Sequence, residues 1–297
     1  MADYDFTYAH ITTAHPSKSQ TSTIGADSVI LVLVNIIIFL LGVSGNGIVI
    51  WISSLKLKRS VNTIWYLSLA VSDFIFCSFI LFSIVYMATS AWPFGLFMCK
   101  FTSFIMFLNM FSSIFLLVII SVDRCASVVF PVWAQNHRTV KAASVLVALA
   151  WIVSVALSVP SAVAHSHETV SFSRFVCGFL IPFVIITLCY AIIVLKLKNN
   201  QMTKSSKPFK VMSALIVTFF VCWLPYHIFV LLEVYDKPNK SNIVRTGLMV
   251  SATLASANSC MNPFLYAFMG KDFKKTCWSS VLSKIENAMD DDVGTST

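Results

Sequence analysis

One acidic side chain stands inside an apolar stretch of this 297-residue chain. Asp73, in SLAVSDFIF, has no other charged residue near it in the sequence. A carboxylate at that depth in a membrane costs a few kcal/mol unless it faces a polar interior. Oxygen-bearing side chains stand at compatible depths on other apolar stretches: Asn46, Asn109, Ser113, Asn258, Ser259 and Asn262. Such oxygens favour a hard monovalent cation over a transition metal, which would need nitrogen or sulfur ligands. A purely structural acid is the alternative.

A second pattern is the charged pair of Asp123 and Arg124 at the end of the apolar run LLVIISVDRCASVVFPVW. An acid beside a base, where a membrane segment meets water, can form an ion pair that a partner opens at modest cost. The pair is therefore a candidate latch at one end of its segment.

Helices that span a membrane are needed to position these side chains. Hydrophobic residues make up 57% of the chain, charged residues 11%, and the mean hydropathy is +0.81, whereas soluble domains have about 25% charged residues. Seven apolar runs reach the roughly 20 residues that cross a bilayer as a helix: 28–55, 74–99, 101–122, 142–164, 175–195, 211–232 and 246–270. The second span is predicted to start before Asp73. The predicted fold is all-α, a seven-transmembrane helix bundle.

The predicted organisation has four parts: a tail over 1–27, a membrane domain over 28–270, a short amphipathic helix on the membrane surface over 271–280 and a tail over 281–297. Lys and Arg concentrate on the side that holds Arg124, which predicts that this side is cytoplasmic and that the N-terminus is extracellular. The formal charge of +8 favours contact with anionic inner-leaflet lipid and gives no case for nucleic acid.

Motifs occur once in each predicted span, in the order known from one family. They are GN at 45–46, SLAVSD at 68–73, DRC at 123–125, Trp151, Pro182 with Tyr190, CWLP at 222–225 and NPFLY at 262–266. Over its whole membrane domain the chain resembles the rhodopsin-like G-protein-coupled receptors. Within them it is similar to the chemoattractant branch, nearest to the chemerin (chemokine-like) receptors and next to the formyl peptide receptors, through segments such as DRCASVVFPVWAQNHRTVK and FFVCWLPYH.

The resemblance implies roles for these positions. Asp123 and Arg124 would form the inner ionic lock, which opens when Arg124 turns toward a G protein. The residues that rearrange around it would be Ile114, Pro182, Tyr190, Phe219, Trp223, Pro225, Asn262, Pro263 and Tyr266. A sodium ion that favours the inactive state would bind at Asp73, Asn109, Ser113, Asn258 and Ser259. Ordinary core packing is the alternative for the aromatic positions.

A buried cation is the main feature of the predicted ligand site. Arg174 lies eight residues before Pro182, and a cation inside a membrane helix favours an anionic partner. A similar Arg in the relatives implies a peptide terminus or carboxylate there, while a side chain that reaches the surface is the alternative. The other predicted ligand residues are Tyr86, Trp92, Met106, Phe107 and Glu233.

The resemblance also implies partners and a location. It implies an extracellular peptide or protein ligand, a heterotrimeric G protein of the inhibitory (Gi) type, arrestin and membrane lipid, for a multi-pass protein of the plasma membrane. It implies no enzymatic activity and no cofactor beyond allosteric sodium.

The chain departs from the family between the fourth and fifth predicted spans. Relatives tie the cysteine at the position of Cys99 to one in a long outer loop, whereas only AHSHETVS connects the two spans here, without a cysteine. A disulfide needs Cα atoms within about 7 Å, so Cys99 is predicted to be a free thiol or to pair with another chain. Asn239 begins the only glycosylation sequon, and Cys277 is a candidate for palmitoylation, with a plain thiol as the alternative.

Three other interpretations stay open. A transporter or channel would show internal repeats or several charges along a path, whereas only Asp73 is deep. An intramembrane enzyme would need paired acids, a Ser with a His, or a metal cluster. A receptor that binds poorly or does not signal would follow from the short outer loop.

Overall fold

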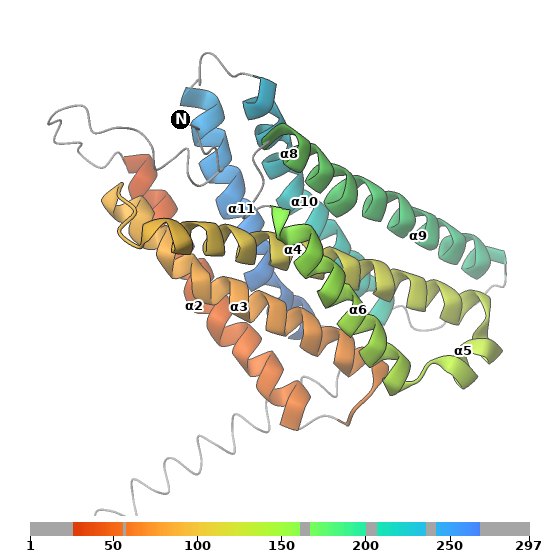
Figure 1. Cartoon of the computed structure of the whole chain (residues 1–297). Helices are drawn as coiled ribbons and strands as arrows, with labels where there is room; N and C mark the ends of the chain where they lie inside the picture. Colours follow the sequence, from red (N-terminus) through yellow and green to blue (C-terminus); the bar gives the residue numbers. More distant parts are fainter. Residues whose placement is uncertain (1–25, 56–57, 161–166, 200–206, 236–241, 268–297) are drawn as a thin grey trace, which may run out of the picture.

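The protein is a bundle of long helices in a computed structural model that describes residues 26–55, 58–160, 167–199, 207–235 and 242–267 (Figure 1). The long helices are α2 (Ala26–Leu55), α3 (Val61–Thr89), α4 (Gly95–Val129), α6 (Val140–Ser158), α9 (Ile181–Asn199), α10 (Lys207–Tyr235) and α11 (Asn242–Ala267). The shorter elements are α5 (Pro131–His137), α8 (His167–Phe175) and the π-helix η1 (Val176–Leu180), which joins α8 to α9. The described residues contain no strand, and the predicted all-α fold is confirmed.

Six helical spans in the described residues are long and apolar enough to cross a membrane: α2, α3, α4, α6, α8 through α9, and α10. The 26-residue α11 has the length but is more polar. Its polar side chains, among them Thr253, Asn258 and Asn262, are buried against the neighbouring helices. Polar residues that face a bundle interior are compatible with a span, so α11 completes the seven.

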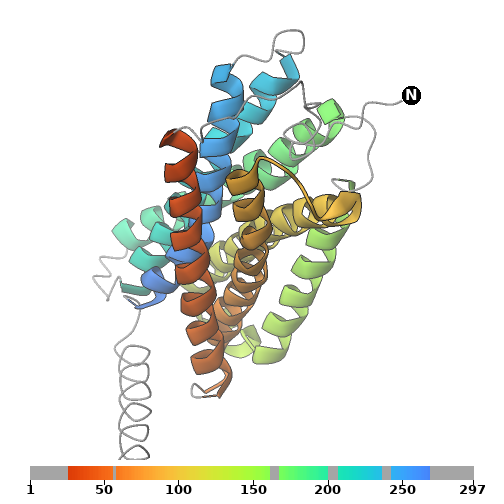
Figure 2. The ribbon, with the colours of Figure 1, turned by 90° about the vertical axis from the view of Figure 1, so that its left-hand side faces the viewer.

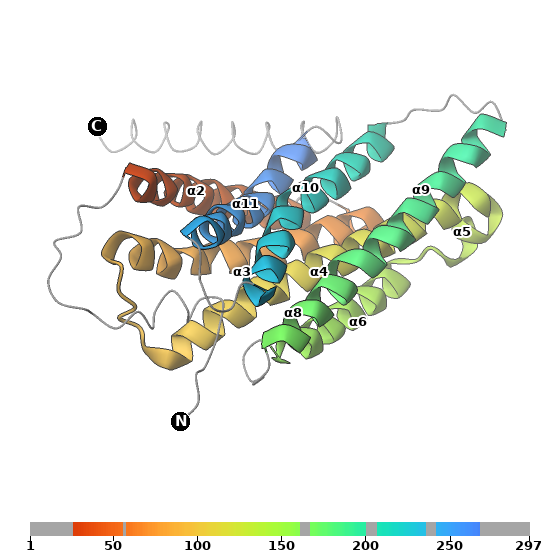
Figure 3. The same cartoon turned by 90° about the horizontal axis from the view of Figure 1, so that it is seen from above.

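The centre of the bundle is α4, which packs against α3, α6 and α9 and is buried over most of its length. Figure 2 shows α2 alongside α11, and Figure 3 places α2 and α9 on opposite sides of the bundle. The outward faces of α2, α6 and α9 expose large aliphatic side chains. Such faces suit a surrounding of lipid, because lipid tails do not drive apolar side chains inward.

The boundary between the second and third spans is not where the charges predict it. The uncharged run over 74–99 predicts a continuous span, but α3 ends at Thr89 and α4 begins at Gly95, with Lys100 inside α4. Ser90 and Gly95 have positive φ angles of 53° and 75° and turn the backbone within the apolar sequence SAWPFG. An apolar turn carries no charge to mark it, which is why the prediction of a single run was wrong.

The connection between the fourth and fifth spans also differs from the prediction. α6 ends at Ser158, and α8 begins at His167, inside the stretch predicted as a loop. Glu168 stands in the first turn of α8, where a negative charge stabilises a helix N-terminus. The helical turns before Phe175 place Arg174 inside the fifth span, as predicted.

Pro182 shapes the fifth span through the backbone before it. Pro182 has no N–H to donate, and the N–H of Ile181 reaches back five residues to the carbonyl of Val176. One additional residue in this turn rotates the preceding helix by about 100° relative to α9. Arg174, which precedes the π-helix, lies on the buried side of α8.

Several predicted features lie outside the described residues: the tails, the surface helix over 271–280, the sequon at Asn239, Cys277 and the side chain of Tyr266. These stay predictions.

The contact between α2 and α3 depends on a glycine. A Cβ added at Gly42 would lie 2.3 Å from Cys77 Sγ and 2.9 Å from its Cβ, whereas one at Gly47 would meet only Phe74 at 3.5 Å. We expect Gly42→Ala to destabilise the bundle by about 1–3 kcal/mol, the usual cost of overpacking, and Gly47→Ala not to do so. Thermal unfolding in detergent measures this difference, and equal midpoints for the two variants would contradict it.

Candidate functional site

The predicted acid, Asp73, is fully buried and connects three helices. Asn109 on α4 donates from Nδ2 to Asp73 Oδ1 at 2.9 Å, and Asn262 on α11 donates from Nδ2 to Oδ2 at 2.7 Å. Ser259 on α11 donates to Asn109 Oδ1 at 3.1 Å. Asn46 on α2 donates to the Ser259 carbonyl at 3.0 Å and adds a fourth helix. We call these five residues the polar cluster.

Two other residues of the predicted sodium site are buried as well. Ser113 Oγ and Asn258 Oδ1 have no hydrogen-bond partner among the described residues. An unsatisfied buried oxygen costs about 1–3 kcal/mol, so each of these atoms can accept a cation contact or a bound water. Carboxylate, amide and hydroxyl oxygens suit a hard ion such as sodium. The residues present therefore fit the predicted ion.

The predicted latch has more members than its two charges. Asp123 Oδ2 lies 3.0 Å from Arg124 Nη2, and Asp123 Oδ1 accepts a hydrogen bond from Arg138 Nε at 2.8 Å. Asn62 Oδ1 accepts from Arg138 Nη2 at 2.6 Å and also from Arg124 Nη2. One carboxylate and one amide oxygen thus hold two guanidinium groups. We call these four residues the latch, and the end of the bundle that holds them the basic end.

Two latch residues, Arg138 and Asn62, are absent from the sequence prediction. Arg138 caps the C-terminus of α5 and lies 15 residues after Asp123. Asn62 lies in the first turn of α3. Neither separation follows a helical period, so no sequence pattern pairs them with Asp123. The sequence signal that could have found these residues was the group of basic residues close to an acidic residue at the end of a span.

The predicted switch residues pack between the latch and the opposite end of the bundle. Phe219 and Trp223 on α10 are completely buried and stack with ring centroids 6.0 Å apart. Ile114 on α4 is also completely buried, and Pro182 is buried on α9. Tyr190 on α9 is close enough to Arg124 for an electrostatic interaction. Pro225 and Pro263 lie inside α10 and α11.

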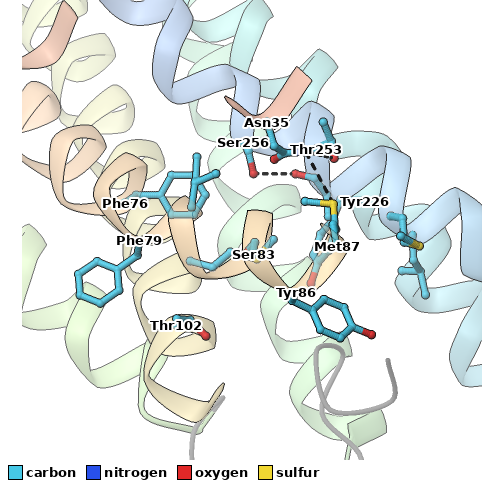
Figure 4. Close-up of a pocket in the computed structure, with 15 residues that line it drawn as sticks. Asn35, Phe76, Phe79, Ser83, Tyr86, Met87, Thr102, Tyr226, Thr253 and Ser256 are labelled. Carbon is cyan, nitrogen blue, oxygen red and sulfur yellow. Dashed lines mark hydrogen bonds between the residues drawn. The ribbon is translucent and has the colours of Figure 1, made fainter. Parts of the chain in front are cut away.

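A pocket opens between α2, α3, α4, α10 and α11 at the end opposite the basic end. Among the predicted ligand residues, Tyr86 (Figure 4) and Met106 line it. The other lining residues are Asn35, Phe76, Phe79, Ile80, Ser83, Met87, Thr102, Tyr226, Leu248, Met249, Ala252, Thr253 and Ser256. None of the lining residues is charged, and within the wall Asn35 Nδ2 donates to Thr253 Oγ1 at 3.0 Å.

The predicted cation lies beside this pocket rather than in its wall. Arg174 is 7% exposed, and its Cζ lies 3.6 Å from the ring centroid of Phe107. The Phe107 ring is 6.4 Å from that of Tyr226, which lines the pocket. Phe107 and Tyr226 therefore connect Arg174 to the apolar pocket.

Two predicted ligand residues are placed elsewhere. Trp92 lies in the turn between α3 and α4, donates to the Gly95 carbonyl at 2.8 Å and has its ring 6.2 Å from Tyr86. Glu233 is half-buried near the end of α10 and is not part of the pocket wall. Cys99, on the first turns of α4, is buried and forms no disulfide with any described cysteine.

Comparison with known proteins identifies the family. Residues 45–266 match the family described as 7 transmembrane receptor (rhodopsin family). The chain belongs to this family of G-protein-coupled receptors. The resemblance inferred from the motifs is confirmed, and the receptor is a multi-pass membrane protein that acts with an extracellular ligand and a G protein and is not an enzyme.

The receptor is similar to several chemoattractant receptors. It is 42% identical to chemerin-like receptor 1 of Homo sapiens over 307 residues, which cover 91% of this chain and 82% of the relative. It is 38% identical to the C3a anaphylatoxin chemotactic receptor of Oncorhynchus mykiss, covering 85% and 77%. It is 36% identical to N-formyl peptide receptor 3 of Homo sapiens, covering 86% and 84%.

The latch geometry gives a test at the basic end. Arg138→Gln removes a hydrogen bond and ion pair that hold Asp123 in the latch. Because partly exposed ion pairs contribute up to about 1 kcal/mol, we expect basal nucleotide exchange on the G protein to rise about two- to five-fold. Lys141→Gln, three residues further on, removes the same charge from an exposed side chain and is the control. Equal basal rates for wild type, Arg138→Gln and Lys141→Gln in a GTPγS assay would contradict a restraining role for Arg138.

Proposed function

We propose that this receptor senses a peptide or protein chemoattractant of the chemerin type at the cell surface and activates G proteins of the inhibitory (Gi) class. Its N-terminus is extracellular, and the basic end faces the cytoplasm. The observation that carries the proposal is the buried guanidinium of Arg174 beside an apolar, uncharged pocket. The similarity to chemerin-like receptor 1 supports the ligand class.

The two parts of this site suit two parts of one ligand. A cation in a membrane bundle is stabilised by an anion, so a peptide carboxylate that enters the bundle would bind Arg174. The pocket wall is formed by Phe, Met, Ile and Leu side chains with a few hydroxyls. Methionines such as Met87 and Met106 adapt their shape to the group they contact. An apolar side chain of the same peptide would bind there.

Signalling would follow from opening the latch. A ligand shifts a two-state equilibrium only by its difference in affinity for the two states. When the ligand favours the active bundle, Arg124 leaves Asp123 and Asn62 and turns to the G protein, with Tyr190 moving beside it. Arrestin binding at the same cytoplasmic face would end the signal.

A sodium ion bound at the polar cluster would act against activation of the receptor. The ion would be held by Asp73, Asn109, Ser113, Asn258 and Ser259, and it supplies only positive charge to the buried carboxylate. Because these side chains belong to α3, α4 and α11, an ion among them stabilises one relative position of the three helices.

A receptor with impaired binding is the second candidate. The residues between α6 and α8 contain no cysteine that could pair with Cys99, and a native disulfide contributes about 2–5 kcal/mol. The 307-residue alignment with the human relative is longer than this whole chain, so the relative has residues within the aligned region that are missing here.

The ligand proposal is tested in cells by inhibition of cAMP, with surface receptor measured in parallel. We expect a chemerin-derived peptide with a free carboxylate to inhibit cAMP, and Arg174→Gln to lower its potency by more than about tenfold, because a lost buried charge pair costs 2–5 kcal/mol. Arg245→Gln, an exposed base on α11, is the control. The amidated peptide should not distinguish Arg174→Gln from wild type.

The outcomes separate the two candidates. If surface receptor is abundant and neither chemerin-derived nor formylated peptides act, while Asp123→Asn raises basal output, the chain is a receptor with impaired binding. If Asp123→Asn also has no effect on G-protein output, the signalling proposal is wrong.

The sodium proposal has its own measurement. In membranes, we expect sodium chloride to weaken agonist binding to the wild type compared with an equal concentration of N-methylglucamine chloride. Asp73→Asn removes the charge that holds the ion, so the difference between the two salts should disappear. A salt difference of equal size in Asp73→Asn would contradict the proposed ion site.

A further inference from the structure

A second cavity, of about 290 Å³, lies at the basic end, away from the ligand pocket and the polar cluster. It is bounded by the start of α3, the last turns of α4, the short helix α5 and the first turns of α6. Figure 1 shows α5 between the ends of α4 and α6. A single water needs only about 10–15 Å³, so this cavity has room for a chain of many carbon atoms.

The cavity walls are largely apolar and open to the outside of the bundle. Val122 on α4 and Leu146 on α6 line it, and both are more than 40% exposed on the outward faces of their helices. Ala126 and Ala142 leave space between them. An opening between the outward faces of membrane helices is next to lipid acyl chains.

Basic and aromatic groups gather where the cavity meets the end of the bundle. Arg138 and His137 line it, and Trp133 stacks on His137 with ring centroids 4.9 Å apart. Trp is enriched at the boundary between hydrocarbon and water, and Lys and Arg at that boundary attract anionic lipid. Asp123, the acid in the cavity wall, is already paired with Arg124 and Arg138.

Arg138 has binding capacity left after its bonds in the latch. A guanidinium has five N–H donors. The latch uses Nε for Asp123 and one donor of Nη2 for Asn62. The Arg138 side chain is 28% exposed. The three other donors can therefore bind a phosphate while the latch stays closed.

We propose that this cavity binds one anionic phospholipid of the phosphatidylserine type, with an acyl chain between α4, α5 and α6 and its phosphate on Arg138. With the proposed orientation, this lipid belongs to the inner leaflet. The cavity is present while Arg138 is hydrogen-bonded to Asp123, which is the closed state of the latch. A lipid that binds the cavity more tightly in this state therefore stabilises the closed latch. The binding site itself does not depend on the proposed ligand, while its effect on signalling rests on the proposed role of the latch.

The binding experiment uses purified full-length receptor in detergent, titrated with dioctanoyl phosphatidylserine or dioctanoyl phosphatidylcholine and followed by native mass spectrometry. We expect saturable binding of phosphatidylserine that is at least about tenfold tighter than binding of phosphatidylcholine. Ala142→Phe fills the cavity and should reduce that affinity by a similar factor. Ala148→Phe, at an exposed position of the same helix outside the cavity wall, should not.

The controls keep the lipid proposal falsifiable. Thermal unfolding verifies that both Phe variants fold, and Val122→Trp fills the cavity from α4 if Ala142→Phe lowers the yield. Equal affinity for the two lipids, equal affinity in Ala142→Phe and Ala148→Phe, or displacement of the lipid by equimolar inorganic phosphate would overturn the site.

The effect on the latch is measured separately in nanodiscs. Wild-type receptor should show lower basal GTPγS exchange with phosphatidylserine present than with phosphatidylcholine alone, and Ala142→Phe should not respond. Lipid binding without this decrease would overturn the coupling to the latch.

Discussion

The buried carboxylate of Asp73 is the constraint on which the bundle depends. Its two oxygens accept hydrogen bonds from Asn109 on α4 and Asn262 on α11. In a low-dielectric interior such bonds are strong, and losing one leaves a costly unpaired group. The three helices therefore have few relative positions that keep both carboxylate oxygens hydrogen-bonded. A bundle with few allowed arrangements can switch between them instead of deforming continuously.

The central helix α4 connects this constraint to the other sites. It contributes Phe107 beside Arg174, Asn109 in the polar cluster, and Asp123 with Arg124 in the latch. A small rotation or shift of α4 changes the surroundings of all three at once. Contact of α5 with the latch through Arg138 extends the same coupling to the surface of the basic end. The proposed ligand, sodium and lipid would thus act on one rigid element.

Much of this could be predicted from sequence because membrane helices must hide polar groups. That rule alone grouped Asp73 with Asn109, Ser259 and Asn262, which the structure brings together. It could not find the turn between α3 and α4, because SAWPFG is apolar, nor the pairing of Arg138 with Asp123, because the path of a connection is set by tertiary packing. The rule predicted an anionic partner for Arg174 but could not show that Phe107 covers its guanidinium, with Cζ 3.6 Å from the ring centroid.

The π-helix before Pro182 has a consequence for how this receptor can change over evolution. The extra residue in that turn sets which face of α8 points inward, so deleting one residue from Val176–Leu180 would turn every upstream side chain by about a quarter of a circle. Arg174 would leave the interior without any change to its own codon. With the proposed role of Arg174, ligand preference is therefore encoded partly in helix phase, and a single-residue indel would alter recognition as deeply as a substitution in the pocket.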